Sequence, residues 1–402
     1  MENLHFTEQT LAKISAQESD FLVSLRKNNF EIFSKLSMPS FKEEEWRYTD
    51  LLSLKLHEFS PIERNHKFRT AALKNKDVIF MPLSKAAKEH PDLIKKYLFT
   101  AHKDFIFSDK LAALESSFWN DGVFLYVPRG VSYEGPISLT SLVDESGKLV
   151  AHHNLIVLEE NASANFYEDL GSAKGKNLFL EGTEVILQEG SRLDYYGLQN
   201  YSAESFSFGY KRGILEKDST LNWNFALFGG KIGKIKVDTV FNGSNSQSEL
   251  QGIYFGQHEQ HLAIITNSYH NVPDTTNKIL TKGVLKDKAT SISHGLVRID
   301  KNAPQTDSYL ADHVIHLGQE AKSNSIPSLE IINNDVKAAH SASSGEVDED
   351  QLFYLMSRGL SKSESETIIV EGFFEPILKK LKIGQMQAKS RWVVEQRTRG
   401  VK

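Results

Sequence analysis

Histidine is the residue type best suited to hold a transition metal in this sequence, because the chain has 14 histidines and no cysteine. Without cysteine the chain has no disulfide, no thiolate nucleophile and no thiolate ligand for zinc or an iron–sulfur cluster. A metal would therefore need imidazole or carboxylate ligands, or thiolates from a partner. The histidines that cluster or stand apart are His152-His153, His258 with His261, His313 with His316, His270, His294 and His340.

His313 and His316 are three residues apart, as are His258 and His261. Residues three apart share a face of a helix but point to opposite faces of a strand. The residues around His313 and His316 favour a strand, so we expect their two rings to point apart and not to share a metal. Any single histidine is more often a surface or structural residue than a ligand.

Acidic runs occur throughout the chain, but none stands out as a general acid paired with a general base. Each is most simply a solvated run or the favourable negative charge at a helix N-terminus. The runs are Glu43-Glu44-Glu45, Glu159-Glu160 and Asp348-Glu349-Asp350.

The glycine-rich segment from Gly229 to Lys234 lacks the features of an ATPase phosphate loop. That motif needs one more residue between its glycines and a Ser or Thr after the lysine, whereas Ile235 follows here. The sequence also has no G-x-G-x-x-G, G-x-S-x-G or H-E-x-x-H motif. We expect a turn between strands at this segment and no ATP hydrolysis by this chain alone.

The composition of the 402 residues is that of a folded protein, with 40% hydrophobic and 25% charged residues. The net charge of −5 argues against a nucleic-acid partner, because such binding rests on clustered Lys and Arg. Apolar runs such as Leu155–Leu158 are far shorter than the roughly 20 residues of a membrane span. The start of the chain lacks the pattern of a signal or transit peptide. We expect a cytoplasmic protein that binds neither membrane nor nucleic acid.

The chain divides into three regions with different residue patterns, namely 1–120, 121–345 and 346–402, and these regions must position the residues named above. The first is helical and mixed, with one amphipathic helix expected after Thr7 and further helices over Pro91–Leu98 and Ser108–Trp119. The second has β-branched and aromatic runs punctuated by Gly, Asn, Asp and Ser, which predicts strands joined by tight turns.

The third region is predicted to be helical again. Asp348 opens an apolar series that stops at Arg358-Gly359, and Ser361 with Glu364 forms a capping box for the next helix. Gly372 and Pro376 are expected to bend or interrupt that helix.

An internal repeat runs through the strand-rich region. A large apolar residue is followed by three polar or glycine residues and then usually by a small residue. The early copies follow one another at a nearly constant long interval, whereas the last copies are much closer together. Stacked strand–turn–strand units of this kind predict a β-solenoid or a two-sheet sandwich. The copies begin at Leu158, Leu187, Leu215, Phe241, Leu285, Ile299, Leu317 and Ile332.

Five segments in order resemble the SufB/SufD family of iron–sulfur cluster assembly proteins, over about residues 39–378. One such segment would be a weak signal, but five in the same order and spacing are specific. The segments are Glu45-Trp-Arg-Tyr-Thr-Asp-Leu51, Val127-Pro-Arg-Gly-Val131 with Gly135-Pro-Ile137, Lys282-Gly-Val-Leu285, Ser328-Leu-Glu-Ile331 through Asp335-Val-Lys337 to His340, and Leu352-Phe-Tyr-Leu-Met-Ser-Arg-Gly-Leu360.

Within this family the sequence is more similar to SufD than to SufB. SufB-like sequences have a cysteine where this chain has Thr306, before Asp307-Ser308. His340 aligns with the functional histidine of the family, while Ala338, Ala339 and Ser341 differ from its usual neighbours. The resemblance therefore implies a subunit that offers an imidazole but no thiolate.

The resemblance also implies a fold and partners. The expected fold is mainly β, a right-handed parallel β-helix flanked by N-terminal and C-terminal helical domains. The expected partners are a SufB-like subunit, bound through the β-helix, and a SufC-like ABC ATPase, bound through Tyr354, Arg358, Gly359 and Leu360. Iron or a nascent iron–sulfur cluster would be held only transiently, with His340 as the candidate ligand, and the chain alone would bind no cofactor.

Two alternatives remain at this stage. A homodimer through the exposed end of the β-helix is reasonable for the isolated chain, although the missing cysteines count against a self-sufficient scaffold. A β-helix enzyme acting on carbohydrate would need clustered charged residues on one face of the solenoid and secretion, and neither is visible. For the C-terminal segment, Phe353 and Leu355 could belong to the core while Arg358-Gly359 caps a helix.

Overall fold

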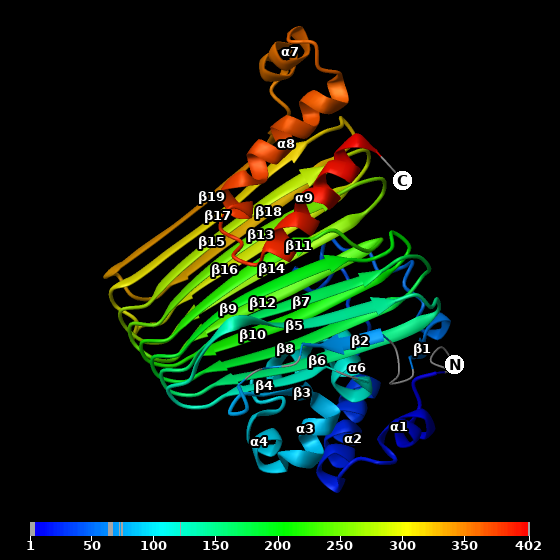
Figure 1. Cartoon of the computed structure of the whole chain (residues 1–402), viewed down its shortest axis with the longest axis vertical. Coiled ribbons are helices and arrows are strands. Elements are labelled where there is room, and N and C mark those ends of the chain that lie inside the picture. The colour runs from blue at the N-terminus through cyan, green and yellow to red at the C-terminus, as the bar shows by residue number, and fades with distance from the viewer. Residues whose placement is uncertain (1–4, 63–66, 72, 74, 121, 401–402) are drawn as a thin grey trace.

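The computed structural model describes residues 5–62, 67–71, 73, 75–120 and 122–400, and successive strands of its central region alternate between two stacked sheets (Figure 1). Sheet A has the order β18-β16-β14-β12-β10-β8-β6-β4-β3, with β1 beside β6, and sheet B has the order β19-β17-β15-β13-β11-β9-β7-β5-β2. All pairs from β4 to β19 are parallel. In the described part of the chain, these strands make about eight coils of a β-solenoid, which confirms the predicted fold class.

The strands are β1 (Ser60–Pro61), β2 (Lys67–Thr70), β3 (Ile79–Pro82), β4 (Val123–Val127), β5 (Ser132–Val143), β6 (Lys148–Leu158), β7 (Ser163–Ser172), β8 (Leu178–Leu187), β9 (Arg192–Asn200), β10 (Phe206–Leu215), β11 (Thr220–Leu227), β12 (Ile232–Phe241), β13 (Gln247–Gly256), β14 (His261–His270), β15 (Thr276–Leu285), β16 (Thr290–Ile299), β17 (Thr306–His316), β18 (Lys322–Ile331) and β19 (Val336–Glu346).

The helices are α1 (Glu8–Ser15), α2 (Asp20–Lys35), α3 (Leu83–Glu89), α4 (Pro91–Tyr97), α5 (Lys103–Ser108), α6 (Lys110–Phe118), α7 (Glu349–Ser357), α8 (Lys362–Leu378) and α9 (Gly384–Arg399), with short 3-10 helices η1 (Glu44–Trp46) and η2 (Leu56–Glu58).

The strand register explains the uneven spacing of the sequence repeat. Leu158, Leu187, Leu215 and Phe241 are direct partners along sheet A, so each long interval between early copies is one whole coil. Leu285 ends a strand of sheet B instead, and Ile299 ends the next strand, which belongs to sheet A. The short intervals between the last copies are therefore half coils.

The small residue of the repeat sits in a crowded corner, as predicted. Ser191, Ser219 and Ala289 are fully buried, and each donates its N–H to the carbonyl three residues earlier to close the turn. The copy after Phe241 departs from this pattern because its turn is one residue longer. Asn245 adopts a φ of 59° there and is exposed, and Ser246 occupies the buried corner.

Helices cover the outer faces of both sheets (Figure 1). The N-terminal helices and the segment around Trp46 pack on sheet A, while α8 and α9 pack on sheet B. Side chains from both sheets fill the interior of the solenoid, including Trp223 from sheet B and Ile264 from sheet A. Strands β1 to β3 precede residue 121, so the first part of the chain contributes to both sheets as well as forming helices.

The structure differs from two expectations about helices, namely a single helix after Thr7 and an interruption at Gly372 and Pro376. The helix after Thr7 is two helices, α1 and α2, and the turn between them brings Glu18 beside Arg26, 2.7 Å from its Nε. The helix α8 runs without interruption through Gly372 and Pro376. Pro376 lies in the last turn, where the only carbonyl it leaves without a donor is that of Gly372, so the helix loses little.

The other helix predictions are confirmed. The helices predicted near Pro91 and Ser108 are α4 and α6. Asp348 caps α7, and the capping box of Ser361 and Glu364 is formed. No helix in the described ranges has the length and apolarity of a membrane span.

Candidate functional site

His340 lies in the middle of β19, the last strand of sheet B. Among the residues that the structure describes, β19 pairs on one side only, with β17. Its register partner Leu310 belongs to the interior core of the solenoid, so His340 points to the interior side of the last coil. No further coil covers this side in the described chain, and the His340 side chain is exposed. The histidine therefore stands at the open end of the solenoid.

The interior-facing rows of β18 and β19 form this open end. The rows are apolar on one side of His340, where Leu329, Val336 and Ala338 pack against the last core cluster. They are small and polar on the other side, where Ser325, Ala342 and Ser344 lie. The imidazole of His340 thus lies at the boundary between the apolar side chains and the small or polar side chains of this open end.

A buried carboxylate lies one strand behind the open end. Asp312 of β17 is the register partner of Ala342 and is almost fully buried. Thr281 Oγ1 donates to Asp312 Oδ1 at 2.5 Å. Burial raises the pKa of Asp312, although hydrogen bonds from Thr281, Ser293 and Ser325 oppose this.

His313 and His316 point to opposite sides of β17, as expected for a strand. His313 Nδ1 lies 2.7 Å from Ser343 Oγ on the outer side, and His316 Nε2 lies 2.9 Å from Ser323 Oγ on the inner side. The two imidazoles therefore have different partners.

Thr306, which occupies the position of the SufB-like cysteine, is buried at the start of β17. Its hydroxyl donates to Ala303 O at 2.9 Å and lies 3.2 Å from Thr275 Oγ1. The hydroxyl of Thr306 is thus used in the hydrogen bonds of this turn, and it is not available as a ligand at the open end.

No three His, Asp or Glu side chains of the described residues converge as a metal site would require. Within the described residues, His340 therefore presents a single exposed imidazole at the open end.

The second predicted site lies at α7, at the same end of the solenoid as β18 and β19 (Figure 1). One of its four residues, Tyr354, lines an apolar groove between α7 and α8. The groove has a volume of about 710 Å³. Apart from Gly372, Asp350 and Gln351, its walls are Ile315, Tyr354, Leu355, Ile368, Ile369 and Phe373.

The four residues predicted to bind the ATPase lie along the end of α7. Arg358 Nη2 donates to Tyr354 Oη at 2.9 Å, and both side chains are exposed. Gly359 ends the helix with a φ of 95°, and Leu360 is half-buried. Phe353 is 73% exposed, so the expectation that it could belong to the core is wrong. The reason is that α7 projects from the solenoid, so the side chains on its outer face are exposed to solvent.

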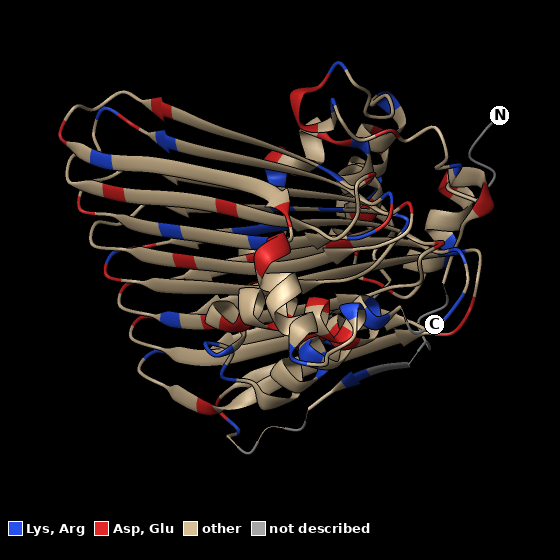
Figure 2. Cartoon of the chain, turned by 90° about the horizontal axis from the view of Figure 1, so that it is seen from above, with Lys and Arg blue, Asp and Glu red and all other residues tan. Residues whose placement is uncertain are grey.

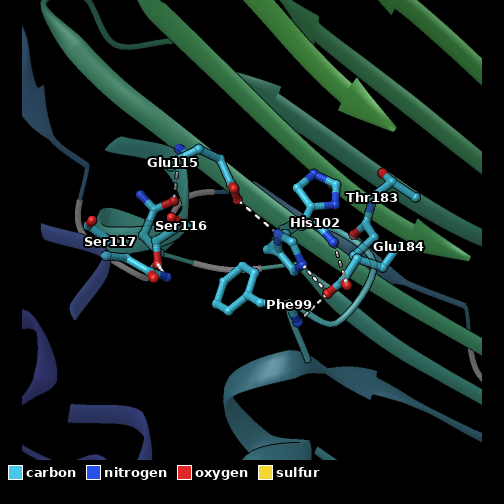
Figure 3. A network of polar contacts seen from close by, with 12 residues as sticks. Phe99, His102, Glu115, Ser116, Ser117, Thr183 and Glu184 are labelled. Atoms are coloured by element: carbon cyan, nitrogen blue, oxygen red, sulfur yellow. Dashed lines mark hydrogen bonds and ion pairs between the residues drawn. The ribbon is translucent and has the colours of Figure 1, made fainter. Parts of the chain in front are cut away.

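A buried ionic network that the sequence did not reveal ties the N-terminal helices to sheet A (Figure 3). Figure 3 labels Glu115 of α6 and Glu184 of β8. The ring of His153 on β6 lies between them, 3.1 Å from each carboxylate. Glu184 also accepts the backbone N–H groups of Phe99, Ala101 and His102. These residues come from four separate parts of the chain.

The charges in this network follow from its surroundings. Burial alone would lower the pKa of His153, but Glu115 and Glu184 outweigh it and raise the pKa to about 9. Burial raises the pKa of Glu115 and holds the pKa of the neighbouring His102 well below its usual value. Gly182 leaves room for the ring, since a Cβ there would lie 2.3 Å from His153 Nδ1.

The acidic run Glu43-Glu44-Glu45 is more than a solvated run, because the carboxylate of Glu45 forms ion pairs with lysines of sheet A. Its carboxylate bonds to Lys236 and lies 3.8 Å from Lys234 Nζ. Burial raises the pKa of Glu45, but these lysines outweigh it and lower the pKa overall. Local sequence could not show this, since the lysines lie far away along the chain.

Lys234, the lysine of the glycine-rich segment, is buried under Trp46, with its Nζ 3.4 Å from the ring centroid. Burial lowers its pKa to about 8. The preceding glycines connect β11 to β12, with Gly230 at a φ of 88°. The segment is thus a connection between strands, and its lysine is not available to a phosphate.

Charged side chains of both signs are interspersed along the strand ends and helices (Figure 2). This distribution differs from the basic stripe that nucleic-acid binding uses.

Comparison with known proteins agrees with this architecture. Residues 141–373 match the family model described as SUF system FeS cluster assembly, SufBD core domain, and residues 62–139 match that of the SufBD protein N-terminal region. The chain belongs to the SufBD family of iron–sulfur cluster assembly proteins.

Individual relatives refine this placement. The chain is 31% identical to the iron-sulfur cluster assembly protein SufD of Bacillus subtilis, over 83% of this chain and 77% of that protein. It is 27% identical to SufB of the same organism, over 87% of this chain and 74% of the relative. A SufBD family protein of Staphylococcus saprophyticus is also 27% identical, over the same shares. The identity to SufD is thus higher than that to SufB, in agreement with the absence of cysteine.

Proposed function

We propose that this chain is the SufD-like, non-catalytic subunit of a SufBCD-type scaffold on which iron–sulfur clusters are assembled. The observation that carries the proposal is the exposed His340 at an uncovered coil of a cysteine-free solenoid. Such a chain offers one nitrogen ligand at an edge where a second solenoid could continue the sheets. The iron ion or nascent cluster is the cargo of this site, and its thiolate ligands would come from the partner.

The edge of the last coil supports pairing with a SufB-like subunit. Strands β18 and β19 each have one unpaired edge in the described structure, and exposed edges invite pairing with another chain. Ile331 and Ile332 at the end of β18 are exposed, which adds apolar surface to this edge. The same features would allow the isolated chain to form a homodimer.

The groove between α7 and α8 supports docking of a SufC-like ABC ATPase. Its walls are apolar and include the exposed Tyr354, and the exposed Arg358 donates to the hydroxyl of Tyr354. Tyrosine and arginine are residue types enriched at binding hot spots. The chain has no phosphate loop of its own, so ATP hydrolysis would belong to the partner.

The carbohydrate-enzyme alternative gains no support from the fold. Helices pack on both outer faces of the solenoid, on sheet A through the N-terminal elements and on sheet B through α8 and α9. An elongated polysaccharide groove along either sheet would have to avoid these helices.

The decisive experiment replaces His340 by alanine in the native complex. We expect His340→Ala to fold and to copurify with its partners, because the side chain is exposed, while cluster formation falls by about tenfold or more as an iron ligand is lost. Cluster formation is followed by visible absorption and by iron content.

The matched control is His258→Ala, another exposed histidine, at the turn before β14. It should leave cluster formation unchanged. Full activity of His340→Ala would contradict the proposed role of this residue.

A further inference from the structure

A second large groove lies on the sheet A side of the molecule and has no part in the proposed function. This N-terminal groove has a volume of about 780 Å³, which lies within the usual range of binding pockets. It is formed by the end of α2 and the chain that follows, with residues 36–41, 47–52 and 54–57 and Lys110 as its walls.

The rim of the N-terminal groove exposes large apolar side chains. Phe41 is 71% exposed, Tyr48 is 49% exposed and Leu52 is 77% exposed. Single exposed apolar residues are normal on a protein surface, but three around one groove mark a contact surface.

The groove is preformed, because the chain that carries these residues is anchored to the rest of the protein. Trp46 is buried and its Nε1 donates to Asp109 Oδ2 at 3.2 Å. Thr49 Oγ1 lies 2.9 Å from His261 Nε2 on β14, and Leu54 is buried. A partner that binds here would not have to order a loose segment first.

The charge left at the groove is positive. Arg47 and Lys55 are exposed around it, and the one carboxylate among its walls is that of Asp50. Asp50 accepts the N–H of Leu52 at 2.8 Å, and the two cations outnumber this one anion.

The other lysine in the wall of the N-terminal groove, Lys110, is hydrogen-bonded to the backbone of the protein itself. Lys110 Nζ donates to the carbonyl oxygens of Phe33 and Leu36 at 2.7 and 2.5 Å. The available cations are thus those of the rim, in a chain whose net charge is −5.

We propose that the N-terminal groove binds an acidic segment of a partner protein that carries large apolar side chains. The apolar side chains would pack against Phe41, Tyr48 and Leu52, and the carboxylates would pair with Arg47 and Lys55. A nucleic acid would need a longer basic track and fewer apolar walls. The N-terminal groove lies on the sheet A side, whereas the groove between α7 and α8 borders sheet B, so the two are separate surfaces.

The test places the photo-crosslinking amino acid p-benzoylphenylalanine at Phe41 of the full chain in its native host. The captured peptide is identified by mass spectrometry. We expect a segment of another protein that is rich in Asp and Glu and contains large apolar residues. The control carries the same amino acid at Phe107 of α5, which is exposed outside the groove, and should not capture this segment.

Charge reversal then tests the electrostatic part of the proposal. The double substitution Arg47→Glu and Lys55→Glu affects exposed side chains and should leave the fold intact. We expect the crosslinking yield at Phe41 to fall by about tenfold or more, since charges at the rim govern association. A synthetic copy of the captured segment should bind the unmodified chain less tightly as salt is added.

Four results would overturn the proposal: capture of no protein, of another copy of this chain, of a basic segment, or a yield that charge reversal leaves unchanged. The test is independent of the proposed function. His340→Ala should leave capture unchanged whether or not that residue serves cluster assembly.

Discussion

At the scale of single residues, His153 shows how the protein retains a charge in its interior. The protonated ring is balanced by Glu115 and Glu184, and Glu184 receives three backbone N–H donors as well. A buried charge survives only when it is paired and hydrogen-bonded in this way. The network therefore fixes the N-terminal helices in one position on sheet A.

We expect His153→Gln to lower the free energy of unfolding by about 3 kcal/mol, because removing one partner leaves buried carboxylates uncompensated. Urea unfolding at pH 7 measures the loss. His258→Gln is the control, since that histidine forms only an exposed pair with Asp287, and its cost should stay below about 1 kcal/mol. Equal losses in both variants would contradict the role of the network.

Other histidines are buried in the neutral form, and they make the protein sensitive to acid. Burial lowers the pKa of His261 to about 4 and that of His270 to about 3. The unfolded chain binds a proton at these residues below its ordinary pKa of about 6.5, whereas the folded chain does not. Stability should therefore fall as the pH drops below about 6.5.

His270→Phe provides the test of this pH dependence. His270 stacks on Phe241 inside the solenoid, with ring centroids 4.4 Å apart, so phenylalanine keeps an aromatic ring at this position but does not titrate. Between pH 7.5 and pH 5 the wild-type chain should lose about 2 kcal/mol more of its unfolding free energy than the variant. Equal losses in urea titrations at the two pH values would contradict the assignment.

At the scale of elements, local sequence predicted the strands and turns well because each coil repeats the same local requirements. The large apolar residue at a strand end and the small residue at the corner are both readable from the sequence. The helix-capping residues Asp348 and Ser361 were equally readable. The break between α1 and α2 was not, because it accompanies the contact of Glu18 with Arg26 and the packing of both helices on α6.

The attachment of α9 depends on a long-range contact of this kind. Arg397 is buried, and its Nη1 donates to Phe255 O at 2.6 Å and to Gln260 Oε1 at 3.2 Å. Burial lowers its pKa to about 9.

We expect Arg397→Met to loosen α9 while the solenoid remains folded. Amide hydrogen exchange should become at least about tenfold faster in α9 and little changed in β9 to β13, because the lost bonds are those between helix and strands. Arg399→Ala is the control, as the Arg399 side chain is half-exposed and its ion pair is with Glu395 on its own helix. Unchanged exchange in α9 would show that Arg397 does not hold the helix.

At the scale of the whole molecule, the two proposed partner surfaces of the scaffold are separate. One is the edge of the last coil, with Ile332 exposed, and the other is the groove between α7 and α8, with Tyr354 exposed. Separate surfaces allow one chain to hold two partners at once.

We expect single substitutions to remove one partner without the other. Ile332→Glu should weaken association with a SufB-like subunit about tenfold or more, and Tyr354→Ala should do the same for a SufC-like ATPase. Copurification of all three coexpressed chains measures both effects. Loss of both partners from either variant, with the fold intact, would contradict separate surfaces.

The sequence by itself determined the repeating strands, the buried corners, the helix caps and the family, because these depend on residues close together along the chain or on motifs in fixed order. It also excluded thiolate chemistry through the missing cysteine. Only the tertiary structure decided that Glu45 pairs with Lys236, that His153 bridges two carboxylates and that His340 lies at an uncovered coil. Those facts depend on stacking coils and packing helices across them, which brings together residues that no local pattern connects.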